Sequence, residues 1–317
     1  MARATRDIDT KRRWFTALGI GLLAVLTVVL VLIAMRSSKP VVATAGDTPG
    51  YVEVAQSAPL AEPEETEEVP EPEEPGHYQV PALGRVLAAS DNETAYRSQG
   101  GPCPNTPANL EVTRDGGATW SAVNAGEELS GISRILARTE GYVLAVAQLS
   151  DNCSQTVVAQ SYGFGDYWEI AEGGEQTTWY VHADDGETVN APDVGPVAAP
   201  CPVARLTSLS AGSALALCQD GSLAVTGDSG LSWSHSDVFP GSQSVTVSAD
   251  TYLLAQSGLD NCDGTQVSRL AGDLTVESGV CVPATGEAAI AGNATGAVWL
   301  WAGDAILRSP DGGLTWQ

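Results

Sequence analysis

The chain has 317 residues, with 15 basic and 39 acidic side chains and a formal net charge of −24. The charge is uneven: residues 1–39 are net basic, whereas from Tyr78 onward there are eight arginines, no lysine and 27 acids. Binding to nucleic acid or anionic lipid depends on cations that neutralise phosphates. We therefore set both classes of partner aside for the C-terminal part.

The N-terminal part predicts a membrane anchor. Residues 14–35 form an unbroken run of apolar or small side chains, long enough to cross the hydrocarbon core as a helix. The basic cluster at residues 11–13 precedes this run, and fewer positive charges follow it. The charge bias places residues 1–13 in the cytoplasm and everything after Arg36 outside.

A cleaved signal peptide ending at Ala45 is the alternative to a retained anchor. Its apolar core would be too long, and Arg36 and Lys39 would lie between that core and the cleavage site. We favour the anchor, with a single pass through the plasma membrane. Few lysines and abundant alanine, glycine and valine suggest a bacterial source.

Residues 36–77 predict a disordered stalk. The stretch 61–76 is a mixture of glutamate and proline that can form no core, because proline favours extended geometry and the glutamates repel one another. At ~3.1 Å per residue the stalk could reach on the order of 100 Å. It serves most simply as a spacer; an acidic tract that binds cations or docks a partner is the alternative.

The six cysteines all follow the anchor. An even number confined to the exported part indicates disulfides rather than a metal site, and no pair has C-x-x-C spacing. The three histidines are scattered. We therefore expect neither a metal site nor a cofactor. The cysteines are Cys103, Cys153, Cys201, Cys218, Cys262 and Cys281.

A repeated octet is the most specific pattern in the chain. Residues 113–120, 226–233 and 309–316 share the pattern Ser/Thr-x-Asp-x-Gly-x-Ser/Thr-Trp, and residues 161–168 are a weaker copy without the Asp position. The pattern predicts a tight turn in which the carboxylate accepts backbone N–H bonds and glycine supplies a positive φ. We expect the tryptophan to begin the next strand and to bury apolar surface between neighbouring sheets. The key positions are Asp115, Gly117 and Trp120; Asp228, Gly230 and Trp233; Asp311, Gly313 and Trp316; and Trp168 in the weaker copy.

Short strand-like runs precede each octet, and no segment after the anchor has long helical periodicity. Four short strands in a unit of ~40–50 residues predict an all-β propeller over residues 78–317. A sixth blade could lie within residues 177–200, and residues 78–80 could close the ring beside the last strand. The five blades that we count are 85–123, 131–171, 203–237, 244–280 and 287–317.

The octet resembles the Asp-box, or BNR repeat, of sialidases and of non-catalytic propellers such as photosystem-assembly factors. The resemblance covers the chain from about Arg85 onward. It implies the propeller fold but says little about function, because the box is a folding device.

The six cysteines map to one end of the predicted propeller. Turns between third and fourth strands carry the octets, and the cysteines fall in loops or connectors at the opposite end. Nearest-neighbour pairing suggests Cys103–Cys153, Cys201–Cys218 and Cys262–Cys281, although six cysteines allow fifteen pairings. The longest connector, residues 175–200, belongs to the same end.

This connector supplies the candidate ligand-binding residues. Its aromatic and acidic side chains would be displayed beside the disulfides, where propellers commonly bind; the alternative is an ordinary solvated loop with one aromatic tucked into the core. The candidates are Trp179, Tyr180, His182, Asp184 and Asp185.

The functional prediction is a binding or scaffolding module for an envelope protein or glycan. The alternative is a glycoside hydrolase of the sialidase type, which needs an arginine cluster, a Tyr–Glu nucleophile pair and an acid. The Phe-Arg-x-Pro signature is absent, and Arg114 and Arg308 lie in or beside octets. The turns at 150–152 and 259–264 could bind Ca²⁺ but lack EF-hand spacing. We expect no catalysis.

Overall fold

The computed structural model describes residues 79–317 except 83, 140 and 184–185. The predicted cytoplasmic segment, membrane helix and stalk lie outside the described residues. Within the described part of the chain, no helix is long and apolar enough to cross a membrane.

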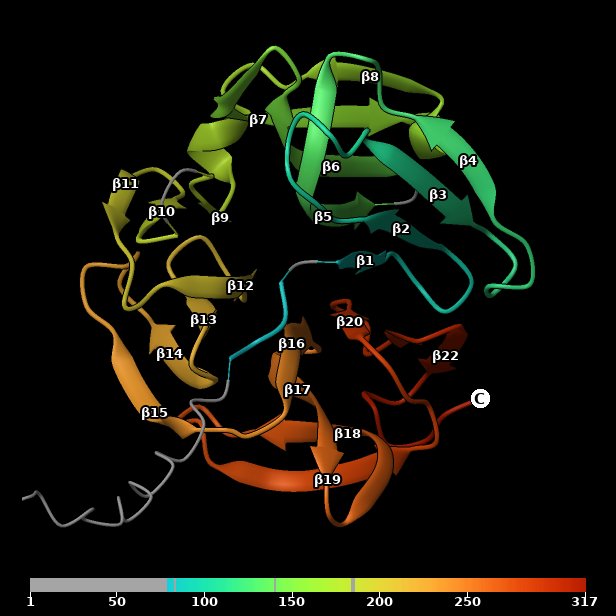
Figure 1. Ribbon diagram of the computed structural model, residues 1–317, viewed down its shortest axis with the longest axis vertical. Helices are drawn as coiled ribbons and strands as arrows, with labels where there is room; N and C mark the ends of the chain where they lie inside the picture. Colours follow the sequence, from blue (N-terminus) through green and yellow to red (C-terminus); the bar gives the residue numbers. More distant parts are fainter. Residues whose placement is uncertain (1–78, 83, 140, 184–185) are drawn as a thin grey trace, which may run out of the picture. The chain divides into compact units, whose positions relative to one another are not determined.

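The described residues form six antiparallel sheets around a common centre, a six-bladed β-propeller (Figure 1). Within each sheet the strands follow chain order, so every connection is a hairpin to the next strand. We number the blades 1 to 6 in chain order; blades 3 and 6 have three strands and the others four.

The first three blades and the two 3-10 helices are bounded as follows: blade 1, β1 (Arg85–Ala89), β2 (Ala95–Gln99), β3 (Asn109–Thr113) and β4 (Ser121–Asn124); blade 2, β5 (Leu129–Thr139), β6 (Tyr142–Leu149), β7 (Asn152–Tyr162), η1 (Gly163–Gly165) and β8 (Tyr167–Ile170); then η2 (Gly174–Thr177); and blade 3, β9 (Tyr180–Val181), β10 (Thr188–Ala191) and β11 (Gly195–Ala198).

The last three blades are bounded as follows: blade 4, β12 (Val203–Ser208), β13 (Ala214–Cys218), β14 (Ser222–Thr226) and β15 (Ser234–Val238); blade 5, β16 (Ser242–Ser248), β17 (Thr251–Leu259), β18 (Cys262–Leu270) and β19 (Val276–Val282); and blade 6, β20 (Ala288–Gly292), β21 (Val298–Ala302) and β22 (Ala305–Ser309).

The count of five blades is wrong, and the stretch 177–200 does contain the sixth. Its sheet, β9–β10–β11, is short because β9 has only two residues. No octet marks this blade; its β10–β11 turn reads Pro-Asp-Val-Gly instead, with positive φ at Asp193 and Gly195. The other five predicted blades each coincide with an observed sheet.

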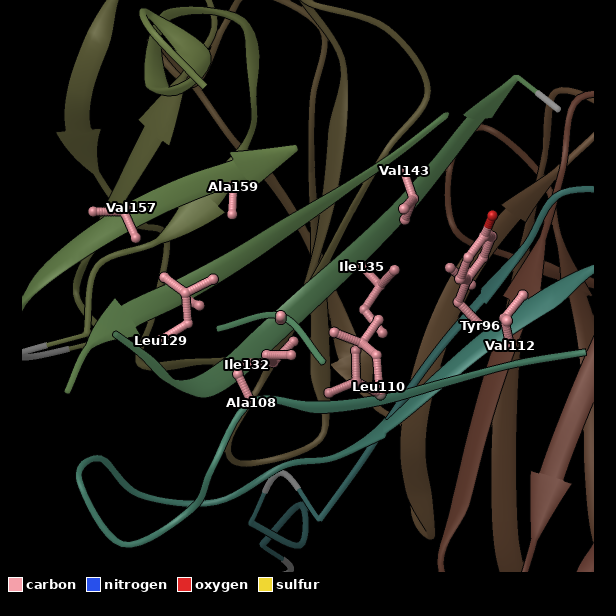
Figure 2. Packing of buried hydrophobic residues seen from close by; sticks show 14 residues of the cluster. Tyr96, Ala108, Leu110, Val112, Leu129, Ile132, Ile135, Val143, Val157 and Ala159 are labelled. Atoms are coloured by element: carbon pink, nitrogen blue, oxygen red, sulfur yellow. The ribbon is translucent and has the colours of Figure 1, made fainter. Parts of the chain in front are cut away.

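Apolar side chains between neighbouring sheets form the core. Figure 2 shows the layer between blades 1 and 2, where Tyr96 and Leu110 of blade 1 approach Ile135 and Val143 of blade 2. All four are at most 5% exposed. Burying each such side chain contributes about 1.5–3 kcal/mol, so the inter-blade layers supply most of the stabilisation.

The predicted ring closure beside the last strand is wrong for Val80. Its backbone N donates to the carbonyl of Gln219, just after β13, at 2.7 Å. The side chain is 8% exposed and packs in the cluster of blades 4 and 5, against residues such as Leu217 and Val245. A buried apolar site there outweighs pairing at the far blade. Tyr78 lies outside the described residues.

The ring closes by packing of blade 6 against blade 1. Leu87 of β1 and Ala289 of β20 share a buried cluster with Trp299 of β21. On the other side of blade 6, Arg308 of β22 and Gln317 exchange two backbone hydrogen bonds of 3.0 Å. Sheet-on-sheet packing therefore joins the first and last blades.

The described residues 79–82 and 84, which we call the strap, lie between blade 4 and β1 (Figure 1). Arg205 Nη2 donates to the carbonyls of Pro81 at 3.0 Å and Ala82 at 3.3 Å. The backbone N of Gly84 donates to Glu287 Oε1 at 3.0 Å. The strap is therefore fastened to blade 4 at its beginning and beside blade 6 at its end.

Candidate binding site

The octet turns have the predicted hydrogen-bond network. Asp115 Oδ1 accepts bonds from the backbone N of Thr119 at 2.9 Å and from Thr113 Oγ1 at 2.8 Å. Asp115 Oδ2 accepts from Thr119 Oγ1 at 2.5 Å, and Thr113 Oγ1 accepts from the backbone N of Gly117 at 2.9 Å. The bonds from Thr119, with that from Thr113, lower the pKa of Asp115 to about 2.

The two other complete octets repeat this geometry. The hydroxyls of Ser232 and Thr315 each donate to the octet carboxylate at 2.7 Å. Bonds from Ser232 lower the pKa of Asp228, and bonds from Thr315 lower that of Asp311 to about 2. The weaker copy lacks the network, and its Trp168 Nε1 is buried without a hydrogen-bond partner among the described residues.

The first octet tryptophan packs across the seam between blades. Trp120 meets Trp299 of blade 6 edge to face, with ring centroids 6.4 Å apart. Trp299 Nε1 donates to the carbonyl of Asp91, in the β1–β2 turn, at 2.8 Å. Gly117, at φ 89°, allows this approach, because a Cβ there would lie 3.2 Å from the Trp299 ring. The octet therefore fixes both a turn and an inter-blade contact.

The same contact recurs between blades 3 and 4, and it involves a predicted ligand-binding residue. Trp233 meets Trp179 edge to face at 6.4 Å. Trp179 Nε1 donates to the carbonyls of Ser210 and Ala211, in the β12–β13 turn, at 3.0 Å each. Trp179 is 2% exposed, so it occupies the core position that Trp299 occupies at the other seam.

The three predicted disulfides are confirmed. Cys103 pairs with Cys153, Cys201 with Cys218 and Cys262 with Cys281, with Cα atoms 5.6, 5.8 and 5.5 Å apart. All three lie at the end of the propeller opposite the octet turns, because they occupy β2–β3-type loops, hairpin tips or blade connectors. We call the two ends the disulfide end and the octet end.

The predicted ligand-binding cluster is not assembled as an exposed loop. Tyr180 is 6% exposed because it lies in β9, the innermost strand of blade 3, and burial raises its pKa. His182 is half-buried, 5.2 Å from the Tyr180 ring, and its Nε2 has no hydrogen-bond partner among the described residues. Asp184 and Asp185 lie outside the described residues. A ligand-binding role for the five stays a prediction.

A cavity of about 1070 Å³ occupies the centre of the propeller. The inner strand of every blade lines it, from Ala82 of the strap to the β16–β17 turn at the octet end. Apart from β5, whose Ser130 also bridges to Pro107, each inner strand pairs with another strand on one side only. Along β20 the other edge donates to β16 side chains, from Ile290 N to Ser244 Oγ and from Gly292 N to Thr246 Oγ1. Ligand pockets measure about 300–1,000 Å³, so this cavity is large enough for a small molecule.

The cavity has the opposite charge balance from the rest of the domain. Four of the eight arginines after Tyr78 line it, whereas among its described lining residues Asp250 is the single carboxylate, out of 27 acids. A cation-lined cleft with low-dielectric walls concentrates anions. The four arginines are Arg85, Arg134, Arg138 and Arg205.

Two of these arginines serve the fold at the disulfide end. Arg85 Nε lies 3.8 Å from Glu287 Oε2, and its guanidinium stacks 4.5 Å from the centroid of the Trp301 ring. Arg205 holds the strap. Their charges are therefore directed at internal partners.

Arg134 and Arg138 of β5 differ from Arg85, since neither has an ion-pair partner among the described residues. Arg134 Nη1 donates to the carbonyl of Trp179, and Nη2 donates to Ser208 Oγ at 3.0 Å. Burial, with the charge of Arg138 second, lowers the pKa of Arg134 to about 9, so it remains charged at neutral pH. Arg138 is exposed.

Sequence reasoning misses this pair, although a signal exists. Residues 132–138 read Ile-Ser-Arg-Ile-Leu-Ala-Arg, with two arginines four residues apart in a mostly apolar run, the spacing that places side chains on one face of a regular strand. In the structure a register shift between Ala137 and Thr139 interrupts the regular alternation at Arg138. The sequence-based prediction treats arginines only as a sialidase requirement. The contacts of Arg134 with Trp179, before β9, and with Ser208 of β12 depend on the order of the blades, which the sequence of β5 alone does not show.

The chain is similar at low identity to several solved structures. No protein-family model matches the chain, and no curated protein matches it. Among solved structures it is similar to YCF48 bound to D1 peptide (17% identity, 75% of this chain and 69% of that chain, TM-score 0.29). It is also similar to the SapL1 lectin in complex with alpha methyl fucoside (13%, 74% and 94%, TM-score 0.43) and to the WD40 propeller domain of Doa1 (12%, 74% and 93%, TM-score 0.41). The fold assignment, an all-β, six-bladed propeller, rests on the six observed sheets, and these similarities carry no argument about the ligand.

Proposed function

We propose that this chain is a membrane-anchored, extracytoplasmic Asp-box propeller of a bacterium that acts as a binding or scaffolding module for an envelope protein or glycan. The observation that carries the proposal is the disulfide end, where three covalent bonds hold loops and hairpins in place. The anchor at residues 14–35 and the stalk would hold this propeller away from the bilayer.

A surface whose loops are cross-linked by disulfides suits binding, because it is preorganised before a partner binds. Association costs conformational entropy when loops become ordered, and cross-linked loops avoid much of that cost. Cys153 is the second residue of β7 and Cys262 the first of β18, and each of these strands is the second of a long hairpin. The tips of the two hairpins carry the exposed Asp151 and Asp260. These hairpin tips are the surface that we expect a partner to contact.

We propose that the propeller is not a glycosidase. Such enzymes need two carboxyl groups flanking the scissile bond. Asp250 is the one carboxylate among the described residues that line the central cavity, and Tyr180, its only described tyrosine, is buried. Among the described residues of the cavity, a substrate would therefore find one acid and no exposed tyrosine.

Site-specific photo-crosslinking in cells tests the binding surface. A crosslinking residue replaces Asp151 or Asp260 at the disulfide end, or Leu231 at the octet end, which is 75% exposed and is the matched control. We expect one envelope protein, or a glycan-bearing species, to be captured from the first two positions and not from Leu231. Equal capture from all three positions, or none from any, would contradict the proposal.

A further inference from the structure

The octet end of the central cavity contains two arginine side chains without an acidic partner among the described residues. Arg138 lies near the end of β5, and the turn that follows is beside the octet-like turn of blade 2, since Phe164 N donates to the carbonyl of Gly141 at 3.1 Å. Arg134 lies four residues earlier and reaches Ser208, the last residue of β12. Both guanidinium groups therefore serve the same half of the cavity.

The bonds of Arg134 leave its charge uncompensated. A carbonyl and a hydroxyl accept from it, and both partners are neutral. Burying a guanidinium without an anion is costly, and a second cation nearby adds to the cost. An anion bound between Arg134 and Arg138 would offset both the cost of burying the Arg134 charge and the repulsion between the two guanidinium groups. The side chain of Arg138 is exposed, and no hydrogen bond to another described residue fixes it. It can therefore move to contact a bound anion.

The chemistry of the pair selects an oxyanion. Guanidinium groups bind carboxylate and phosphate oxygens with paired, charge-assisted N–H bonds. The domain as a whole is acidic, whereas the described lining of the cavity has four arginines and one carboxylate, so a negative ligand finds net positive charge among these residues. Asp250, across the mouth on the β16–β17 turn, is the one described carboxylate that lines the cavity and opposes binding.

We propose that Arg134 and Arg138 form a binding site for the carboxylate or phosphate group of a small ligand that enters the central cavity from the octet end. This site is separate from the disulfide end, so it stands or falls independently of the surface proposed above.

Isothermal titration calorimetry of the purified full chain with citrate and with inorganic phosphate tests the site. We expect saturable binding of at least one probe, and the probe that binds distinguishes carboxylate from phosphate recognition. Arg138→Gln should weaken binding by about tenfold or more, the usual loss for one hydrogen bond to a charged group. Asp250→Asn should tighten binding, because it removes the opposing charge.

Arg114→Gln is the matched control. Arg114 is exposed beside the first octet turn and lies outside the cavity lining, so this variant changes the net charge equally and should bind as the native chain does. No saturable binding of either probe, or the same loss in Arg114→Gln as in Arg138→Gln, would overturn the proposal. Arg138 is the better position to substitute, because the bonds of Arg134 to Trp179 and Ser208 also support the fold.

Discussion

Asp115, Asp228 and Asp311 show how one carboxylate can organise a turn that is open to solvent. Each accepts bonds from a backbone N–H and two hydroxyls, which hold its pKa below the ordinary value. A carboxyl group with a depressed pKa in the folded state stabilises the fold above its unfolded pKa. The stabilisation is lost as pH falls through the folded value.

We therefore predict an acid limb in the stability of the propeller between about pH 4 and about pH 2. Asp115→Asn should lower the unfolding free energy at neutral pH and make this limb shallower, because asparagine does not titrate. Chemical denaturation at a series of pH values measures both effects. Asp151→Asn, an exposed hairpin-tip substitution, is the control; an unchanged acid limb in Asp115→Asn would contradict the prediction.

A second prediction concerns the paired tryptophans at the seams. Trp179→Phe and Trp299→Phe should each lower the unfolding free energy by about 1–3 kcal/mol, because buried carbonyls lose their indole donor. Trp168→Phe is the control, since its Nε1 has no partner to lose among the described residues. Denaturant midpoints measure the three effects. A larger loss in Trp168→Phe than in the other two would refute this account.

At the residue scale, local chemistry can be predicted from the sequence and distant packing cannot. The octet bonds join residues two or four apart, so the pattern contains all the partners. The sequence pattern alone places Trp179 in a displayed loop, because its partner, Trp233, belongs to the next blade. Only the observed order of the blades brings the two rings together.

At the scale of elements, the three disulfides cross-link the blades and loops, and they differ in the length of the loop that each one closes. Cys103–Cys153 spans 50 residues and joins two blades, whereas Cys262–Cys281 spans 19 residues within blade 5. A longer closed loop restricts the unfolded chain more. Paired Cys→Ser substitutions should therefore cost about 4 kcal/mol for the first bond and about 3 kcal/mol for the second.

Chemical denaturation under non-reducing conditions measures this order of stability. The Cys201–Cys218 double substitution, with a span of 17 residues, should match the Cys262–Cys281 variant. If removing Cys103–Cys153 costs the least of the three, the constraint on the unfolded chain is not the controlling effect.

Blade 3 shows why element counts from repeats can fall short. A count based on octets and strand runs passes over this blade, which has no octet and a two-residue inner strand. Its place in the ring is held by neighbours: Arg134 of blade 2 and the β12–β13 turn of blade 4 both bond to Trp179. When the contacts that position a blade come mainly from neighbouring blades, its own sequence shows little of the alternating pattern that predicts strands.

At the scale of the whole molecule, the ring depends on side-chain packing at the seam and on the strap. Val80→Ala should lower the unfolding free energy by about 1–2 kcal/mol, because it removes apolar surface from a buried site that ties the strap to blades 4 and 5. Denaturation followed by tryptophan fluorescence measures the loss. Val194→Ala, at a position 51% exposed, is the control and should have little effect; equal losses would show that Val80 is not a fastening point.

The strap also determines how the propeller would carry a mechanical load. A pull that enters at residue 79 first meets the bond between Val80 and Gln219, and then the bonds from Arg205 to Pro81 and Ala82. These bonds yield one after another, as in peeling, so each needs little force. Breaking these bonds lets the strap extend, and this extension lowers the tension in the chain before β1 is loaded. Extension of the strap would therefore reduce the force that reaches the packing between blades 1 and 6.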